Sequence, residues 1–202
     1  MPNLWYPKSA SDRSGPMWES SLGAFRYTGI EKARVLFPRA ITPETGALAA
    51  QIPSAIEANV GAVVIECAIE ANVFSYNASG AGTANAVTRF VLFSVDGATQ
   101  LFNLTDAVGA ATGVRTITIS PVVFLFPGIY YIFDCLSSGT TAPGMSHWTT
   151  TNNPFITGGT GEPDLEGVLT ITGGAAPTTL DPTALTTPAT SRTLCFRLDG
   201  TD

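Results

Sequence analysis

The chain has 202 residues, of which only 13% are charged and 45% are hydrophobic, and its formal net charge is −6. This length suits one β-sandwich or jelly-roll domain with a substantial core. A negative net charge repels a phosphate backbone, which argues against nucleic-acid binding. A surface with so few charges is expected to be buried in part against copies of itself or against a partner.

Residues 1–32 are predicted to form an N-terminal docking arm. Their aromatic residues stand among Pro, Ser and Gly, with no period of two or 3.6 residues, and they need a surface to pack on. We interpret the arm as binding another polypeptide; the alternative is that it wraps its own domain. No signal peptide is expected, and no apolar run is long enough to cross a bilayer. The aromatic residues assigned to partner binding are Trp5, Tyr6, Trp18, Phe25 and Tyr27.

Residues 33–202 are predicted to form an antiparallel, jelly-roll-like β-sandwich. Runs of β-branched and aromatic residues alternate with Gly, Asp and Pro, which is typical of strands joined by turns. No comparable stretch has helical periodicity. Residues 44–58 are predicted to be a short helix or a loop, and residues 137–161 mostly a loop. Strands are expected at residues 34–41, 62–70, 87–95, 99–104, 114–119, 122–126, 129–136, 168–172 and 193–198.

The alternation within these strands predicts one core between two facing sheets. The segment 173–192 consists mainly of Gly, Ala, Pro and Thr, with Leu180 and Leu185 as its only bulky apolar residues. Such a segment cannot form a core of its own. We therefore predict a long crossing connection, ordered by an adjacent subunit of a homo-oligomer. The residues predicted to build the core are Ile65, Cys67, Phe90, Leu92, Tyr131, Phe133 and Phe196.

No set of residues in the sequence predicts catalysis or a bound cofactor. His147 is the only histidine, which excludes a site with several imidazole ligands, and no nucleophile motif accompanies it. The acidic loop at residues 162–166 lacks the ligand spacing of a calcium loop. We expect no enzyme activity, no metal and no cofactor.

The cysteines and the aromatic residues near loops allow two interpretations each. Cysteines 67, 135 and 195 lie in strand-like runs, so buried thiols are expected, while a disulfide between two of them stays open. Aromatic rings near loops can stack on sugar rings or can pack in the domain. The residues considered for glycan stacking are Tyr76, Trp148 and Phe155.

Residues 34–136 carry a resemblance to a known module. Its marks are Arg34-Val-Leu-Phe, the alternating run 62–70, Arg89-Phe-Val-Leu-Phe and Phe126-Pro-Gly-Ile-Tyr-Tyr. These patterns resemble a β-sandwich module of bacteriophage virion proteins, found in head-decoration, fibre and tail-fibre proteins. The chain lacks the long shaft of repeats that usually precedes the module in a tail fibre.

The resemblance implies a non-enzymatic structural protein of the virion, assembled as a homotrimer. Its partners would be itself and the major capsid protein or another virion protein, which it would decorate or cement. The alternative is a tail-fibre or baseplate module that contacts host surface polysaccharide. The third interpretation is a carbohydrate-binding or esterase-like accessory domain of an enzyme. The resemblance leaves open the choice between head and tail, the exact oligomeric state and the host.

Overall fold

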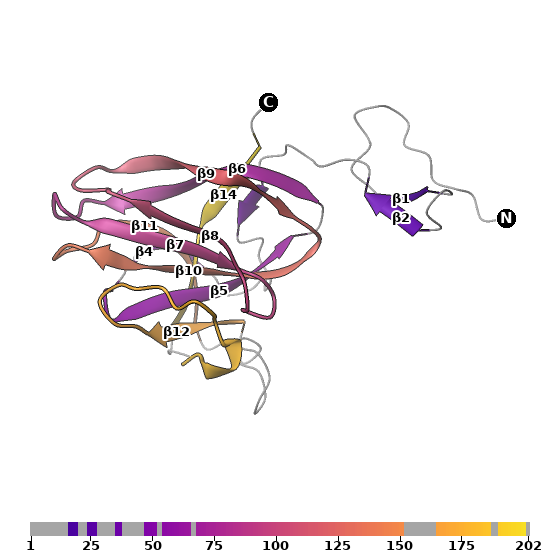
Figure 1. Ribbon diagram of the computed structural model, residues 1–202. Coiled ribbons are helices and arrows are strands. Elements are labelled where there is room, and N and C mark those ends of the chain that lie inside the picture. Colours follow the sequence, from indigo (N-terminus) through magenta and orange to yellow (C-terminus); the bar gives the residue numbers. More distant parts are fainter. Residues whose placement is uncertain are drawn as a thin grey trace.

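The computed structural model shows an antiparallel all-β protein (Figure 1), as the sequence predicts. It describes the backbone of residues 16–19, 24–27, 35–37, 47–51, 54–65, 68–151, 165–186 and 190–200. Side chains are described for residues 54–65, 68–147, 165–186 and 193–200. Within these parts of the chain, the only helical element is one 3-10 turn, η1 (Pro182–Ala184).

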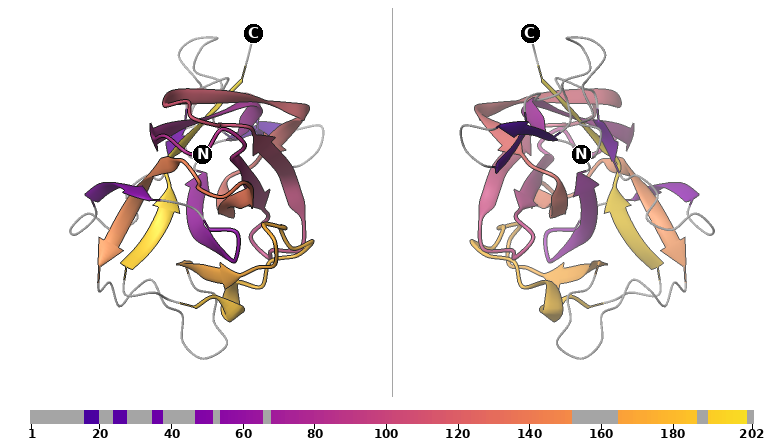
Figure 2. Two further views of the ribbon diagram at one scale, coloured as in Figure 1. Left: turned by 90° about the vertical axis from the view of Figure 1, so that its left-hand side faces the viewer. Right: turned by 90° about the vertical axis from the view of Figure 1, so that its right-hand side faces the viewer.

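Two sheets form the sandwich. The five-stranded sheet has the order β12 (Glu166–Thr170), β5 (Glu57–Ile65), β10 (Gly128–Ser138), β7 (Val87–Phe93) and β8 (Gln100–Asp106). The seven-stranded sheet has the order β13 (Thr190–Leu194), β11 (Gly144–Thr151), β6 (Ile69–Gly80), β14 (Phe196–Asp199) and β3 (Val35–Phe37). In the same sheet β4 (Ala47–Gln51) pairs with β11, and β9 (Gly113–Leu125) pairs with β6. The end views in Figure 2 show the layered arrangement.

The pairing of the six central strands is nested. β7 pairs with β8, β6 pairs with β9, and β5 pairs with β10. The outer and inner pairs lie in the five-stranded sheet, and the middle pair lies in the seven-stranded sheet. A fourth pair, β4 with β11 in the seven-stranded sheet, encloses these three, and four nested pairs that alternate between two sheets are the connectivity of an eight-stranded jelly roll.

Several local expectations need correction. Residues 44–58 are neither a helix nor a loop throughout, because 47–51 form β4. The stretch expected to be mostly loop contains β11. Pro121 does not start a new strand: β9 continues through it, and the register jumps from the Val73–Thr118 pair to the Ala71–Val123 pair. A proline fits there because β9 pairs with β6 alone among the described strands, so its missing N–H breaks no ladder.

The prediction of a single core is wrong, because two apolar clusters lie on opposite faces of the five-stranded sheet. Ile65, Phe90, Leu92 and Phe196 belong to the cluster between the sheets, and each is at most 2% exposed. Tyr131 and Phe133 belong to the second cluster, on the outer face. Both faces of β7 and β10 are therefore buried; Cys67 lies outside the described residues.

The second cluster is covered by the chain itself. Ile171, Leu180 and Leu185 pack on the outer face of the five-stranded sheet. Gly97 and Gly174 have positive φ. A Cβ on Gly97 would clash with the carbonyl oxygen of Leu180, and a Cβ on Gly174 would clash with the carbonyl oxygen of Leu136. The described part of the Gly/Ala/Pro/Thr-rich segment, residues 173–186, thus lies on its own sandwich. This contradicts the expectation that an adjacent subunit orders that part.

Within the N-terminal arm, the structure describes one two-stranded unit. β1 (Pro16–Glu19) pairs antiparallel with β2 (Ala24–Tyr27), with Trp18 opposite Phe25. The expectation of an irregular arm therefore does not hold for these eight residues, which form a hairpin. The side chains of the arm lie outside the described residues.

Candidate interaction site

The aromatic residues singled out for glycan stacking do not form a described site. Tyr76 is only 2% exposed and packs in the core between the sheets, so it is not a stacking residue. Trp148 lies on β11, opposite Leu48 and Thr193, and its side chain is not described. Phe155 lies outside the described residues, as do Trp5 and Tyr6 of the arm.

Tyr76 belongs to a polar bridge between the two sheets. Its hydroxyl donates to Asp106 Oδ2 at 2.9 Å, and Arg115 donates to both carboxylate oxygens of Asp106 at 2.9 and 2.8 Å. Tyr76 and Arg115 come from the seven-stranded sheet and Asp106 from the five-stranded sheet. The side chains of Arg115 and Asp106 are 29% and 14% exposed. We call these three residues the outer bridge.

The protonation of the outer bridge follows from its contacts. Burial raises the pKa of the Tyr76 phenol, so the phenol stays protonated and donates. Burial alone would raise the pKa of Asp106, but hydrogen bonds from Arg115 and Tyr76 outweigh it and lower the pKa. Hydrogen bonding to Asp106 raises the pKa of Arg115. The outer bridge is therefore an ion pair with a neutral phenol, and it has no group poised to exchange a proton near neutral pH.

His147 lies in a second, fully buried bridge between the sheets. Its Nε2 lies 3.1 Å from both carboxyl oxygens of Asp134, and its Nδ1 lies 3.1 Å from the carbonyl oxygen of Met145. Asn59 donates to Asp134 Oδ2 at 3.1 Å. His147 and Asp134 are 0% and 1% exposed. We call His147, Asp134 and Asn59 the inner bridge.

The inner bridge looks like part of a catalytic triad but cannot act as one in this geometry. The carbonyl of Met145 can only accept, so Nδ1 carries a proton, and a second proton is held between Nε2 and the carboxyl group. Both ring nitrogens are thus engaged within the interior. A general base needs a free nitrogen within reach of a substrate, and a pair this deeply buried offers none. The pair holds the two sheets together.

A metal centre and a reactive thiol are the other kinds of chemistry considered for the described part of the chain. There, no group of three or more His, Cys, Asp and Glu side chains is arranged to hold a metal ion. Cys135 and Cys195 are thiols, and burial raises the pKa of Cys135 to about 12. Cys67 lies outside that part. None of the helices described is long and apolar enough to span a membrane.

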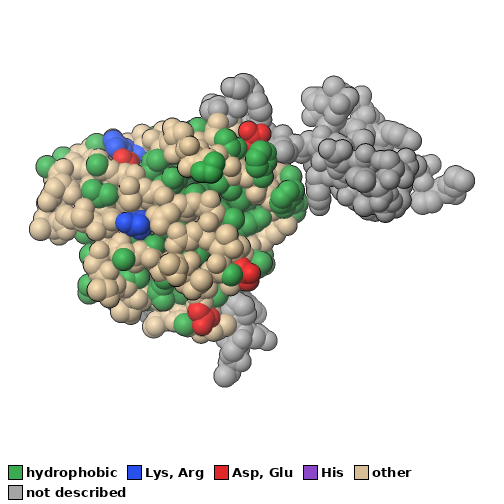
Figure 3. All heavy atoms as spheres, viewed as in Figure 1, with side chains coloured by type: hydrophobic (Ala, Val, Ile, Leu, Met, Phe, Trp, Pro, Cys, Tyr) green, Lys and Arg blue, Asp and Glu red, His purple; other side chains and the backbone are tan. Residues whose placement is uncertain are grey.

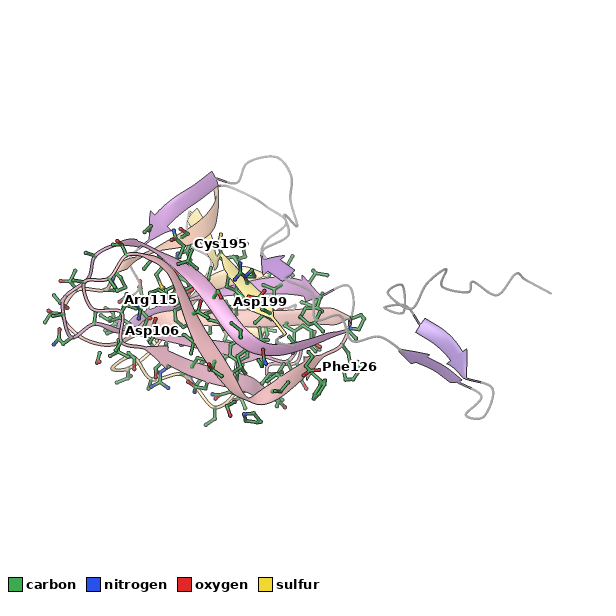
Figure 4. The ribbon with its side chains drawn as sticks, turned by 90° about the horizontal axis from the view of Figure 1, so that it is seen from above. Asp106, Arg115, Phe126, Cys195 and Asp199 are labelled. Carbon is green, nitrogen blue, oxygen red and sulfur yellow. The ribbon has the colours of Figure 1, made fainter. Side chains whose placement is uncertain are left out.

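The most unusual feature of the described surface is an apolar patch at one end of the sandwich. Four large hydrophobic side chains from the end of β9 and the start of β10 are exposed there (Figure 3), and Figure 4 labels Phe126 among them. The two phenylalanines are 52% and 59% exposed, against 38% and 39% for the aliphatic residues. We call this set the end patch: Val122, Phe124, Phe126 and Ile129.

A partly buried side chain holds the turn of the end patch in place. The Tyr130 ring packs against the core between the sheets. Its hydroxyl donates to the carbonyl oxygen of Phe126 at 2.8 Å and accepts from the Phe126 N–H at 3.1 Å. Both backbone groups of Phe126 are therefore fixed, while its side chain faces solvent. A surface ordered in advance loses less conformational entropy on binding.

The end patch adjoins an open sheet edge. Among the described strands, β9 pairs only with β6, so one side of this 13-residue strand has no strand partner. Proteins usually blunt such edges with charge, prolines or bulges. β9 has Pro121 and a register jump but carries Val122 and Phe124 beside them. The residues there suit contact with another polypeptide better than contact with water.

Comparison with known proteins adds no relative: no protein-family model matches the chain, and no curated protein sequence matches it.

Sequence reasoning missed both the end patch and the inner bridge. An all-apolar run at residues 122–126 beside a proline was the available signal for the patch, because such a run places apolar side chains on both faces of a strand, and a sheet covered on one side buries only one of these faces. Nothing local marks the inner bridge, since its partners Asn59 and Asp134 are 75 positions apart in sequence. The arm residues assigned to partner binding remain a prediction.

Proposed function

We propose that this chain is a non-enzymatic structural protein of a bacteriophage particle that works by protein–protein contacts at the particle surface. The observation that carries the proposal is the end patch: an ordered apolar surface beside an open edge strand on a sandwich with very few charges. Large exposed apolar patches mark interaction sites in soluble proteins. The resemblance of residues 34–136 to phage virion sandwiches supplies the setting.

Within this setting we favour a capsid decoration, cement or head-fibre protein, assembled as a homotrimer. The outer and inner bridges support a structural role, because each holds the two sheets together rather than opening toward solvent with a reactive group. A receptor-binding tail module is less well supported, since Tyr76 is buried and cannot stack on a sugar ring.

The test is to locate the protein and measure what it binds. Purified full-length chain is incubated with empty phage capsids and, separately, with host cells and host surface polysaccharide. Binding to capsids, with antibody labelling of the head on intact particles, supports the proposal. Binding to cells or glycan without binding to capsids would replace it with the receptor-binding module. Absence of the protein from purified particles would reject both.

A further inference from the structure

We infer that the end patch is the docking site for the aromatic N-terminal arm of a second copy of this chain. The proposal concerns self-association only, and it gives the homo-oligomer of the proposed function a specific contact. Its occupant is residues 1–34, which include the β1–β2 hairpin and all five aromatic residues of the arm.

The arm enters the sandwich at the end that carries the patch. β3 and β6 both pair antiparallel with β14, so they run in the same direction. β6 begins at Ile69, which lies opposite Leu125. The first residue of β3, Val35, is therefore at the end of that strand that lies toward the β9–β10 turn. The arm and the patch belong to the same end of the molecule.

A single copy leaves this surface uncovered. The strands β1 and β2 stand clear of the sandwich, beyond the end where β9 turns into β10 (Figures 1 and 4). The arm and the patch are at the same end of the molecule. If a rotation axis beyond that end relates the copies of the chain, the arm of each copy meets the patch of the next. Such an exchange closes into a ring and leaves no unmatched patch.

The charges of the two parts are complementary. Residues 1–34 carry five basic and three acidic side chains, a net charge of +2. Since the whole chain carries −6, residues 35–202 carry −8. At the patch itself, the partly exposed Glu70 lies opposite Phe124 on the neighbouring strand. An arm that combines aromatic and basic residues fits an apolar patch with an acidic neighbour.

Sedimentation of the full-length protein over a range of concentrations tests the contact. Phe124→Ser combined with Phe126→Ser should weaken self-association by about tenfold or more, because truncating central aromatic contacts has that effect. Trp18→Ser combined with Phe25→Ser should weaken it similarly. Val114→Ser is the matched control: it removes the 73% exposed apolar residue at the other end of β9 and should leave association unchanged.

Mixing the two double variants separates exchange between copies from folding back within one chain. The patch variant still supplies an intact arm, and the arm variant still supplies an intact patch, so the mixture should regain part of the lost association. Circular dichroism confirms that each variant is folded. A mixture that stays monomeric overturns the inference, as does a wild-type monomer whose arm resists trypsin at every concentration.

The inference and the proposed function fail separately. A protein that associates through arm and patch but is absent from phage particles rejects the proposed function alone. A protein that enters particles but sediments as a monomer rejects the inference alone.

Discussion

The two polar bridges join the same pair of sheets in opposite environments. The outer bridge pairs Arg115 with Asp106 at an edge that solvent reaches, whereas the inner bridge holds His147 and Asp134 at 0% and 1% exposure. An exposed ion pair gains little because water solvates the separated charges nearly as well. A buried pair costs free energy to assemble but far more to break, since the remaining partner is left in the interior. The inner bridge should therefore be the stricter constraint on the fold.

The largest effect is expected from Asp134→Ala, which removes the carboxyl group of the inner bridge. The free energy of unfolding should fall by about 3–5 kcal/mol, because His147 Nε2 and the Asn59 amide lose their partner. Urea denaturation followed by tryptophan fluorescence measures the change. Glu57→Gln, which removes an exposed charge at the start of β5, is the control for net charge. If the free energy of unfolding fell by less than about 1 kcal/mol, the two bridges would contribute equally to stability, and the comparison would fail.

Asn59→Ala removes one hydrogen bond from the inner bridge and leaves the His147–Asp134 contact. A hydrogen bond to a charged group contributes about 1.5–3 kcal/mol, and the loss should lie in that range. In the Asp134→Ala background the same substitution should cost much less, because its acceptor is already gone. Additive losses from the two substitutions would show that Asn59 acts independently of the bridge.

Arg115→Ala tests the outer bridge and should cost only about 1 kcal/mol at neutral pH, because the pair is partly solvated. The pKa of Asp106 lies below its ordinary value of 3.8 in the folded protein, so the pair stabilises the fold above about pH 4. The stabilisation is lost as the pH falls through the lowered pKa. The wild type and Arg115→Ala should therefore converge in stability in acid. Arg197→Ala, which breaks an ion pair within β14 alone, should cost less at pH 7.

The smallest effect is expected from salt. At about 1 M ionic strength the Debye length falls to about 3 Å, which screens exposed charges. The cost of Arg115→Ala should shrink by a few tenths of a kcal/mol, while the cost of Asp134→Ala stays constant. Equal salt sensitivity of the two variants would contradict the difference in burial.

Several strands were predictable from local alternation, but β4 and β11 were missed, and the expected strand 62–70 spans the break between β5 and β6. Residues 129–136, for example, fall within β10, and Ile132 and Asp134 share a face as expected. The error about the core arose at Phe133. Alternation separates Phe133 from Ile132, but it does not say what covers each face. Here a segment about 40 residues further on, around Ile171, supplies the second cover.

The interaction surface was predictable only in part. Low charge and aromatic density predicted that residues 1–32 need a partner, yet the receiving surface depends on β9 being an edge strand. That property follows from the pairing of the whole sheet. The inner bridge depends on long-range pairing in the same way. The apolar run 122–126 was a local signal for the end patch, but no local pattern marks the inner bridge.

Nested strand pairing also determines which order of strand pairing costs the least loop-closure entropy during folding. The β7–β8 hairpin closes a loop of only a few residues, whereas β5 and β10 are separated by more than sixty positions. Once the inner hairpin exists, it shortens the effective loop that β6 and β9 must close, and their pairing shortens the next. We expect substitutions in β7 and β8 to slow refolding, and substitutions on β12 to accelerate unfolding instead. The sandwich would then assemble from its middle outward, with β12 and residues 171–186 added last.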